Sequence, residues 1–117
     1  MNNFKALSLY DVLNRIYTDN TDKINVKVGY KMIQNKNELE HKTKSFVEMR
    51  ENIIKKYAVD GVIEPTNEHY NDAINEISEI GNEECNIDLK KIKLDDVGDI
   101  ELTLADMDAL SPMIDDE

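Results

Sequence analysis

The apolar residues near the start of the chain recur at helical spacing. After Ser8 they follow one another at short steps, as Leu9, Val12, Leu13, Ile16 and Tyr17. This spacing places them on one face of a helix, and the hydroxyl of Ser8 is suited to cap its first turn. The pattern predicts an N-terminal helix within segment 1–22 that begins at Ser8 and ends in the polar cluster 18–22.

A second apolar series describes a much longer helix within segment 23–58. Four of its residues repeat at seven-residue steps, namely Met32, Leu39, Phe46 and Ile53. Such a repeat is typical of a long helix with one apolar stripe, and it predicts a helix over residues 28–58. Shorter helices of the same chain or a second copy would cover the stripe. Residues 24–30 also alternate between apolar and polar types, so this stretch either forms a strand or opens the helix.

Segment 59–81 predicts a loop followed by a third helix. Asp60-Gly61 is a typical helix stop, and Pro65 follows in the loop. Asn67 is suited to cap the next helix, which Gly81 would end. Its apolar face consists of Tyr70, Ala73, Ile74 and Ile77.

In segment 82–117 the apolar residues begin to recur at every second position. Cys85, Ile87 and Leu89 alternate with polar residues, which predicts a strand. An acidic turn at 95–99 and a returning strand at 100–102 would complete a C-terminal β-hairpin. Thr103 and Asp106 are spaced as a capping box, which predicts a short helix before an acidic tail at 115–117.

These elements predict one α+β domain over residues 1–117. One long helix would pack with two or three shorter helices and a small C-terminal β-hairpin. The length of 117 residues suits one modest core. No apolar run approaches the length that crosses a bilayer, and no apolar leader follows the first residues. The single cysteine excludes an internal disulfide, so we expect a reduced, cytoplasmic setting and no membrane partner.

Charge is distributed unevenly between the two halves of the chain. Residues 1–58 carry a net charge of +4, whereas residues 59–117 carry −15. An acidic surface of this density repels nucleic acid and attracts basic protein surfaces. A solvated face that keeps the protein dissolved is the simpler interpretation.

The sequence shows no pattern of an enzyme. His41 and His69 have no second histidine at ligand spacing, and the alternation around Cys85 points this thiol into the core. The acidic turn at 95–101 does not follow the EF-hand spacing, and no phosphate loop or nucleophile elbow is present. We therefore expect no catalytic residue, no metal and no cofactor.

Several segments in order along the chain resemble a family of small uncharacterised phage and prophage proteins of Firmicutes. The resemblance covers about residues 24–114 and rests on segments 30–32, 53–58, Asp60-Gly61, 88–94 and 100–103, and on Ala109-Leu110. These motifs are structural, so the resemblance implies a phage context and no activity, substrate or cofactor.

Two groups of carboxylates are the candidate partner-binding residues. The first recurs at three- or four-residue steps as Glu64, Glu68, Asp72, Glu76 and Glu79, which predicts a stripe along a helix. The second comprises Asp95, Asp96 and Asp99. We expect these residues to face a basic surface on a host or phage protein. The favoured function is a phage-encoded, stoichiometric inhibitor of a host nucleic-acid-targeting defence enzyme, of the anti-CRISPR kind. The alternative is a virion-assembly or scaffold protein that self-associates through the long helix into a homo-oligomer.

Overall fold

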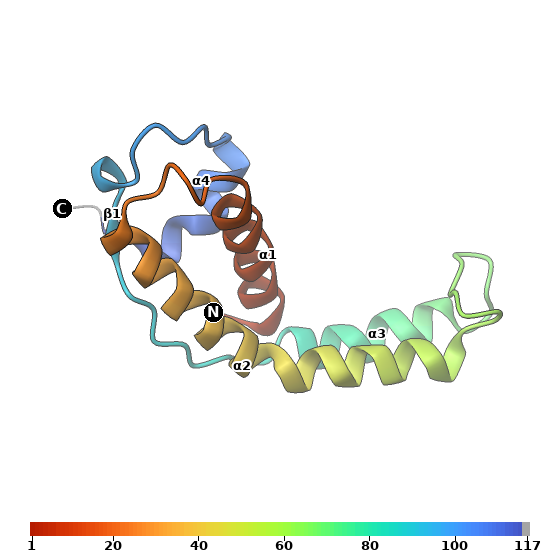
Figure 1. The fold of residues 1–117 in the computed structure, drawn as a ribbon. Helices are drawn as coiled ribbons and strands as arrows, with labels where there is room; N and C mark the ends of the chain where they lie inside the picture. The colour runs from red at the N-terminus through yellow and green to blue at the C-terminus, as the bar shows by residue number, and fades with distance from the viewer. Residues whose placement is uncertain (116–117) are drawn as a thin grey trace.

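One helix, α2 (Val26–Tyr57), runs the length of the molecule (Figure 1). The computed structural model describes residues 1–115, and its extents are 49, 26 and 22 Å. A helix of 32 residues rises about 48 Å, so α2 alone sets the longest dimension. Its first half is covered by most of the chain, which we call the head. Its second half pairs with α3 (Tyr70–Gly81) and the joining loop to form an arm, residues 44–81 (Figure 1).

The first helix, α1 (Asn3–Asp19), is present but begins earlier than predicted. Its N-cap is Asn2, whose side chain accepts the backbone N–H of Lys5 at 2.9 Å. Ser8 lies exposed inside the helix, so the prediction that it caps the helix is wrong. The apolar face extends back to Ala6, which is fully buried, and this extra turn of core contact favours the earlier start.

Residues 24–30 open the long helix, so the strand interpretation is wrong. The side chain of Asn25 accepts the backbone N–H of Val28 at 2.9 Å and caps α2. Val28 and Met32 are buried at helical spacing, whereas Val26 and Tyr30 face solvent. The alternation read from the sequence therefore combines one buried and one exposed face of the same helix.

The α+β class is confirmed, but the small β element is not the predicted hairpin. Strand β1 (Ile92–Lys93) pairs in parallel with β2 (Ile114–Asp115). Residues 100–102 form no strand, and a 3-10 helix (Leu94–Asp96) lies within the predicted hairpin. Asp115 of the predicted acidic tail belongs to β2, and residues 116–117 lie outside the described part of the chain.

The segment that precedes β1 makes one antiparallel bridge with the start of the chain, between Glu84 and Asn2, and then packs on α2. Cys85 is buried and Ile87 and Leu89 are half-buried, so the predicted inward face is confirmed. Asn35 of α2, which has no exposed surface, holds the segment. Its amide nitrogen donates to the carbonyl of Lys90 at 2.9 Å, and its amide oxygen accepts the N–H of Lys90 at 2.7 Å. One side-chain amide thus makes both bonds that a neighbouring strand would make.

Helix α4 (Leu104–Leu110) has the predicted capping box. The Thr103 hydroxyl accepts the N–H of Asp106 at 3.0 Å, and the Asp106 carboxylate accepts the N–H of Thr103 at 3.1 Å. Asp106 also forms an ion pair with Arg15 of α1. The Thr103 N–H bond and then the Arg15 charge hold the pKa of Asp106 below its usual range. A nearly buried carboxylate thereby fastens α4 to α1.

The hydrophobic core lies in the head, between α1, the first half of α2, α4 and the segment around β1 (Figure 1). Its innermost side chains belong to Leu9, Leu13, Ile16, Met32, Leu39 and Met113. The arm contributes only Phe46, Ile53 and Ala73 to the buried apolar residues. Among residues 1–115, no helix combines the length and apolar character needed to cross a membrane.

The first testable prediction concerns Asn35. Replacement of Asn35 by Leu should lower the free energy of unfolding by about 1–3 kcal/mol, because the backbone groups of Lys90 lose their partners. Urea unfolding followed by circular dichroism measures this loss. Asn37→Leu on the exposed side of α2 is the matched control, with an expected change within about 0.5 kcal/mol. Equal effects of the two substitutions would contradict the bridging role of Asn35.

A second prediction concerns Gly81, where the arm joins the head. A Cβ atom at this position would overlap the ring of Phe4, which packs edge-on against Phe46 with centroids 5.5 Å apart. Gly81→Ala should therefore destabilise the protein by about 1–3 kcal/mol. Thermal unfolding of this variant and of Gly29→Ala provides the comparison.

Gly29 is the matched control because a Cβ atom there would lie at an ordinary 3.4 Å from the side chain of Ile24. Alanine should stabilise the interior of α2 by about 0.8–1 kcal/mol relative to glycine. The two glycine replacements are thus expected to shift the unfolding temperature in opposite directions. A stable Gly81→Ala variant would mean that the Phe4 ring moves aside freely.

Candidate partner-binding surface

A tight turn forms the far end of the arm. Val59 and Val62 exchange backbone hydrogen bonds of 2.9 and 3.2 Å. Between them, Asp60 has φ of 54° and Gly61 has φ of 81°, the combination that a type I′ turn requires. Asp-Gly tolerates these angles at little cost. Helix α2 ends at Tyr57 with Ala58 as its extended C-cap, so Asp60-Gly61 forms a turn beyond the helix and is not the helix stop that the sequence predicted.

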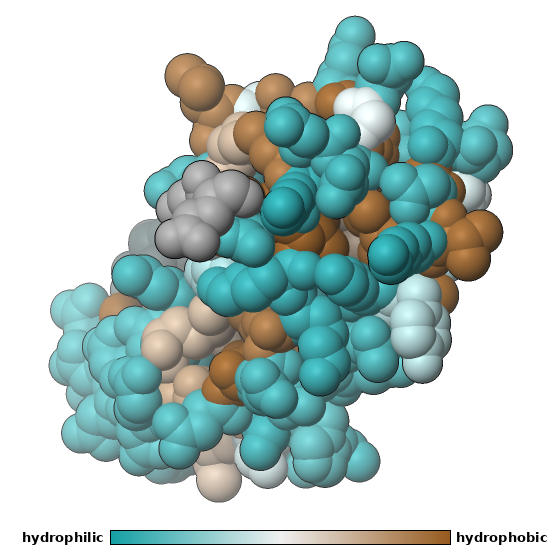
Figure 2. All heavy atoms as spheres, turned by 90° about the vertical axis from the view of Figure 1, so that its left-hand side faces the viewer, coloured by the Kyte–Doolittle hydropathy of each residue, from teal (hydrophilic) through white to brown (hydrophobic). Residues whose placement is uncertain are grey.

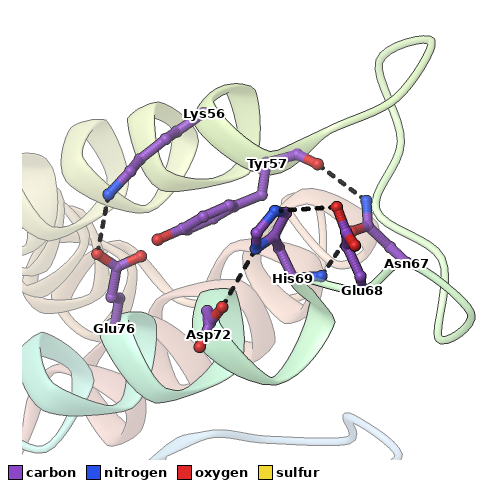
Figure 3. A network of polar contacts seen from close by, with 7 residues as sticks. All are labelled: Lys56, Tyr57, Asn67, Glu68, His69, Asp72 and Glu76. Atoms are coloured by element: carbon purple, nitrogen blue, oxygen red, sulfur yellow. Dashed lines mark hydrogen bonds and ion pairs between the residues drawn. The ribbon is translucent and has the colours of Figure 1, made fainter.

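Asn67 closes the loop between the two helices of the arm (Figure 3). Its amide nitrogen donates to the carbonyl of Tyr57 at 2.9 Å, and its amide oxygen accepts the N–H of His69 at 2.8 Å. The N-cap of α3 is His69, whose side chain makes no capping bond. The prediction that Asn67 is the N-cap is therefore wrong, because its side chain joins the end of α2 to the loop.

His69 is surrounded by acidic and aromatic groups at the start of α3 (Figure 3). Its two ring nitrogens lie 3.4 Å from a carboxylate oxygen of Glu68 and 3.2 Å from one of Asp72. Its ring stacks on Tyr57 with centroids 5.3 Å apart. Glu68 and Asp72 are thus held near the histidine while most of their own surface stays exposed.

Glu76 is directed towards α2 and not towards a partner. Its carboxylate lies 3.2 Å from the Lys56 ammonium, and the Tyr57 hydroxyl points at the same carboxylate (Figure 3). The nearby Tyr57 hydroxyl, followed by the Lys56 ammonium, lowers the pKa of Glu76. Tyr57 and Glu76 in turn raise the pKa of Lys56. These groups join the two helices of the arm.

The five candidate carboxylates of the arm do not form one helical stripe. Glu64 and Glu68 belong to the loop, because α3 begins only at Tyr70. Asp72, Glu76 and Glu79 lie on α3 as the spacing predicts, but Glu76 is engaged by Lys56. A spacing of three or four residues places side chains on one face only where the backbone is helical. Pro65 and Asn67 keep the stretch that carries Glu64 and Glu68 in a loop.

The second group of carboxylates lies at the opposite end of the molecule. Asp95, Asp96 and Asp99 are all exposed, and the carbonyl of Asp96 accepts a hydrogen bond of 2.9 Å from Asn25, the cap at the start of α2. The loop that carries Glu64 and Glu68 is instead tied to the end of α2 through Asn67. About 48 Å of helix separates this second group from Glu64 and Glu68, so the eight carboxylates cannot contribute to one compact surface.

The tip of the arm, residues 58–72, combines negative charge with exposed apolar groups. It contains Asp60, Glu64, Glu68 and Asp72 and no Lys or Arg. Val59 and Val62 are 67% and 57% exposed, and they line a shallow hollow of about 320 Å³ beside Asp60 and Glu64. Sequence analysis missed these valines because they follow the end of α2 and belong to no periodic pattern. Their position on either side of Asp-Gly was the available signal.

Cys85 lies in the core of the head, as its place in the alternating segment predicted. It is 8% exposed, and burial raises the pKa of its thiol, which disfavours the reactive thiolate. Within residues 1–115, no three His, Cys, Asp or Glu side chains are grouped so that they could hold a metal ion.

Comparison of the chain with protein-family models, with curated proteins and with solved structures gave no match. The phage family therefore stays an expectation from the sequence segments described above.

The contacts of Glu76 predict how the stability of the arm responds to pH. A carboxylate whose pKa is lowered on folding stabilises the protein above its unfolded pKa, about 4.3 for glutamate, and loses this effect as the pH falls through the lowered value. Glu76→Gln should therefore lower the unfolding temperature at neutral pH. This difference from the unsubstituted protein should vanish in strong acid.

Thermal unfolding of both proteins over a series of pH values tests this expectation. Glu79→Gln is the control, because Glu79 makes no ion pair with any residue of the described chain. At the alkaline limit, the contribution of Lys56 should persist beyond the usual lysine pKa of about 10.4, since its folded pKa is raised. A difference between Glu76→Gln and the unsubstituted protein that is the same in acid and at neutrality would contradict the role of the carboxylate charge.

Proposed function

We propose that this chain is a non-enzymatic protein-binding module that presents the tip of its arm to a partner with a basic surface. One observation carries the proposal: the tip has four carboxylates and no Lys or Arg, together with two exposed valines. Opposite charges accelerate the encounter between two proteins, and buried apolar contact then supplies affinity. The narrow arm, which extends beyond the core of the head (Figure 1), suits insertion into a recess.

In its most specific form, the proposed partner is a host defence enzyme that targets nucleic acid. The channels with which such enzymes hold nucleic acid are rich in Lys and Arg, which is the surface that an acidic tip complements. The chain itself, with a net charge of −11, is poorly suited to bind nucleic acid directly. In this form the protein is a phage-encoded stoichiometric inhibitor, of the anti-CRISPR kind, that acts in the cytoplasm of the host.

The second candidate is a virion-assembly or scaffold protein. It is favoured by the length of α2 and by the separation of exposed surfaces at its two ends, since a protein that links others needs more than one contact site. The resemblance to phage proteins supports both forms equally. The inhibitor form uses the tip as its contact surface, whereas the assembly form self-associates through the long helix α2.

A capture experiment tests the tip and distinguishes the two forms. The tagged protein, a Val59→Ser/Val62→Ser variant and a Met49→Ser control are each used to recover proteins from lysate of infected host cells at low and high salt. Met49 is 49% exposed and lies on α2 outside the tip. We expect the partner to be recovered by the unsubstituted protein and the control, and to be reduced at least tenfold with the tip variant or at high salt.

The identity of the recovered protein then decides between the forms. A nucleic-acid enzyme in near-equal amount supports the inhibitor, and capsid or tail proteins support the assembly role. A partner retained equally by all three proteins would show that the tip is not the binding surface. Recovery of the partner that does not depend on salt would contradict the proposed role of the carboxylates in binding.

A further inference from the structure

The buried apolar side chains of the molecule fall into two separate groups. The larger group fills the head and comes from α1, the first half of α2, α4 and the segments before and after α4. The smaller group lies in the arm and consists of Phe46, Ile53 and Ala73, none of which belongs to the core of the head. Polar side chains cover most of the face of the head that looks away from the arm (Figure 2). The head therefore has a core of its own, to which the arm adds no buried apolar side chain.

At the tip, α3 is joined to the end of α2 by contacts near the surface. Glu76 lies 3.2 Å from the Lys56 ammonium, and the ring of His69 stacks on that of Tyr57. The side chains of Lys56 and His69 are 60% and 49% exposed. Ion pairs in contact with solvent contribute little to stability. The contacts that hold this end of α3 are therefore individually weak.

At its other end, α3 is held by the first turn of α1. The side-chain amide of Asn3 donates to the carbonyl of Ile80 at 2.8 Å. The ring of Phe4 lies against Gly81 and packs edge-on on Phe46 of α2. Phe4 thus contacts both helices of the arm at once. We call the contacts of Asn3 and Phe4 with the arm the N-terminal clamp.

We propose that α3 and the loop before it detach from α2 as one unit while the head stays folded. Segments with few buried apolar contacts open at a lower free energy than the core. Helix α3 has 12 residues, and isolated helices shorter than about 12–15 residues are marginal in water, so the detached α3 loses its helical structure. The arm half of α2 instead continues a helix that the head has already nucleated. The closed and the open arm are therefore two states of the folded protein.

Opening of the arm takes the tip apart and uncovers part of α2. The side chain of Asn67 bonds to the carbonyl of Tyr57 and to the N–H of His69, so the shape of the tip requires α3 to lie beside α2. Phe46 and Ile53, which are 4% and 8% exposed, lose the helix that covers them. One consequence rests on the proposed role of the tip: the open arm does not bind the partner, so the opening equilibrium sets the fraction of competent molecules. The N-terminal clamp would control that fraction from the opposite end of α3.

Hydrogen–deuterium exchange of the free protein, followed by mass spectrometry of its peptides, measures this opening. After correction for intrinsic rates, amides of α3 should exchange at least tenfold faster than those of α1, yet more slowly than in an unstructured peptide. Urea below the unfolding transition should accelerate exchange in the head more than in α3, because local opening exposes less surface than global unfolding. The urea series needs no substitution.

Two substitutions separate local opening from global unfolding. Ile16 is 2% exposed in the core of the head, so Ile16→Val should accelerate exchange in the head about threefold or more and leave α3 unchanged. Phe4→Ala removes the clamp from the closed arm and should accelerate exchange in α3 about fivefold or more. Tyr30→Ala is the matched control for the loss of an aromatic ring and should leave α3 unchanged, because Tyr30 is 62% exposed on the head half of α2.

Three outcomes would overturn the proposal. Equal protection of α3 and the head, with equal acceleration of both by Ile16→Val, would mean that the arm unfolds only with the whole chain. Exchange of α3 at the rate of an unstructured peptide would mean that the arm has no closed state. Exchange of α3 that Phe4→Ala leaves unchanged would mean that the N-terminal clamp does not control the opening.

The exchange experiment needs no partner, so its result is separate from that of the capture experiment. If α3 exchanges only together with the head but capture still depends on Val59 and Val62, the opening is wrong and the binding role of the tip stands. If α3 opens locally but capture does not depend on these valines, the opening stands and its consequence for partner binding is wrong.

Discussion

The structure depends on a mismatch between the length of one helix and the size of the core. The core of this 117-residue chain covers about half of α2. The helix nevertheless continues for 32 residues, because Asn25 caps its start and the apolar repeat extends along its length. Apart from Phe46, which packs on Phe4 of α1, the second half of α2 buries its apolar stripe against α3. A two-helix arm results, and polar contacts such as Lys56 with Glu76 supplement its few buried side chains.

The helices could be predicted because the relevant signals are local. The apolar spacing of α1, the seven-residue repeat of α2 and the Thr103–Asp106 capping box each lie within a few turns of chain. The C-terminal β element could not be predicted in the same way. The alternation around Cys85 predicted which side chains are buried, but periodicity does not predict which part of the chain forms hydrogen bonds with an extended segment. Here the backbone at Cys85 bonds to Met1 and that of Lys90 bonds to the side chain of Asn35, 55 residues away. Strand β1 pairs with a strand that lies beyond α4.

The candidate surface was predicted only in part. Acidic residues were correctly expected near α3, but the spacing rule treated Glu64 and Glu68 as helical, although they precede its first turn. An interpretation based on charge alone also overlooked Val59 and Val62, which lie between two helices and belong to no apolar repeat. The position of the second acidic group at the start of α2 follows from tertiary structure, since the contact of Asn25 with Asp96 and the burial of Val97 place it there. The sequence thus gives the number of acidic residues, but the path of the folded chain decides which of them share a surface.

The seven-residue repeat has a further consequence for the reach of the arm. An α-helix advances about 700° in seven residues, which is within about 20° of two full turns. One additional repeat in each of the antiparallel helices α2 and α3 would therefore lengthen the arm by about 10 Å while nearly restoring the direction in which its far end faces. The core, the Asn35 bridge and the Asp-Gly turn would be unchanged. The length of the arm can therefore change in steps of one heptad without a change in the head or in the turn at the tip.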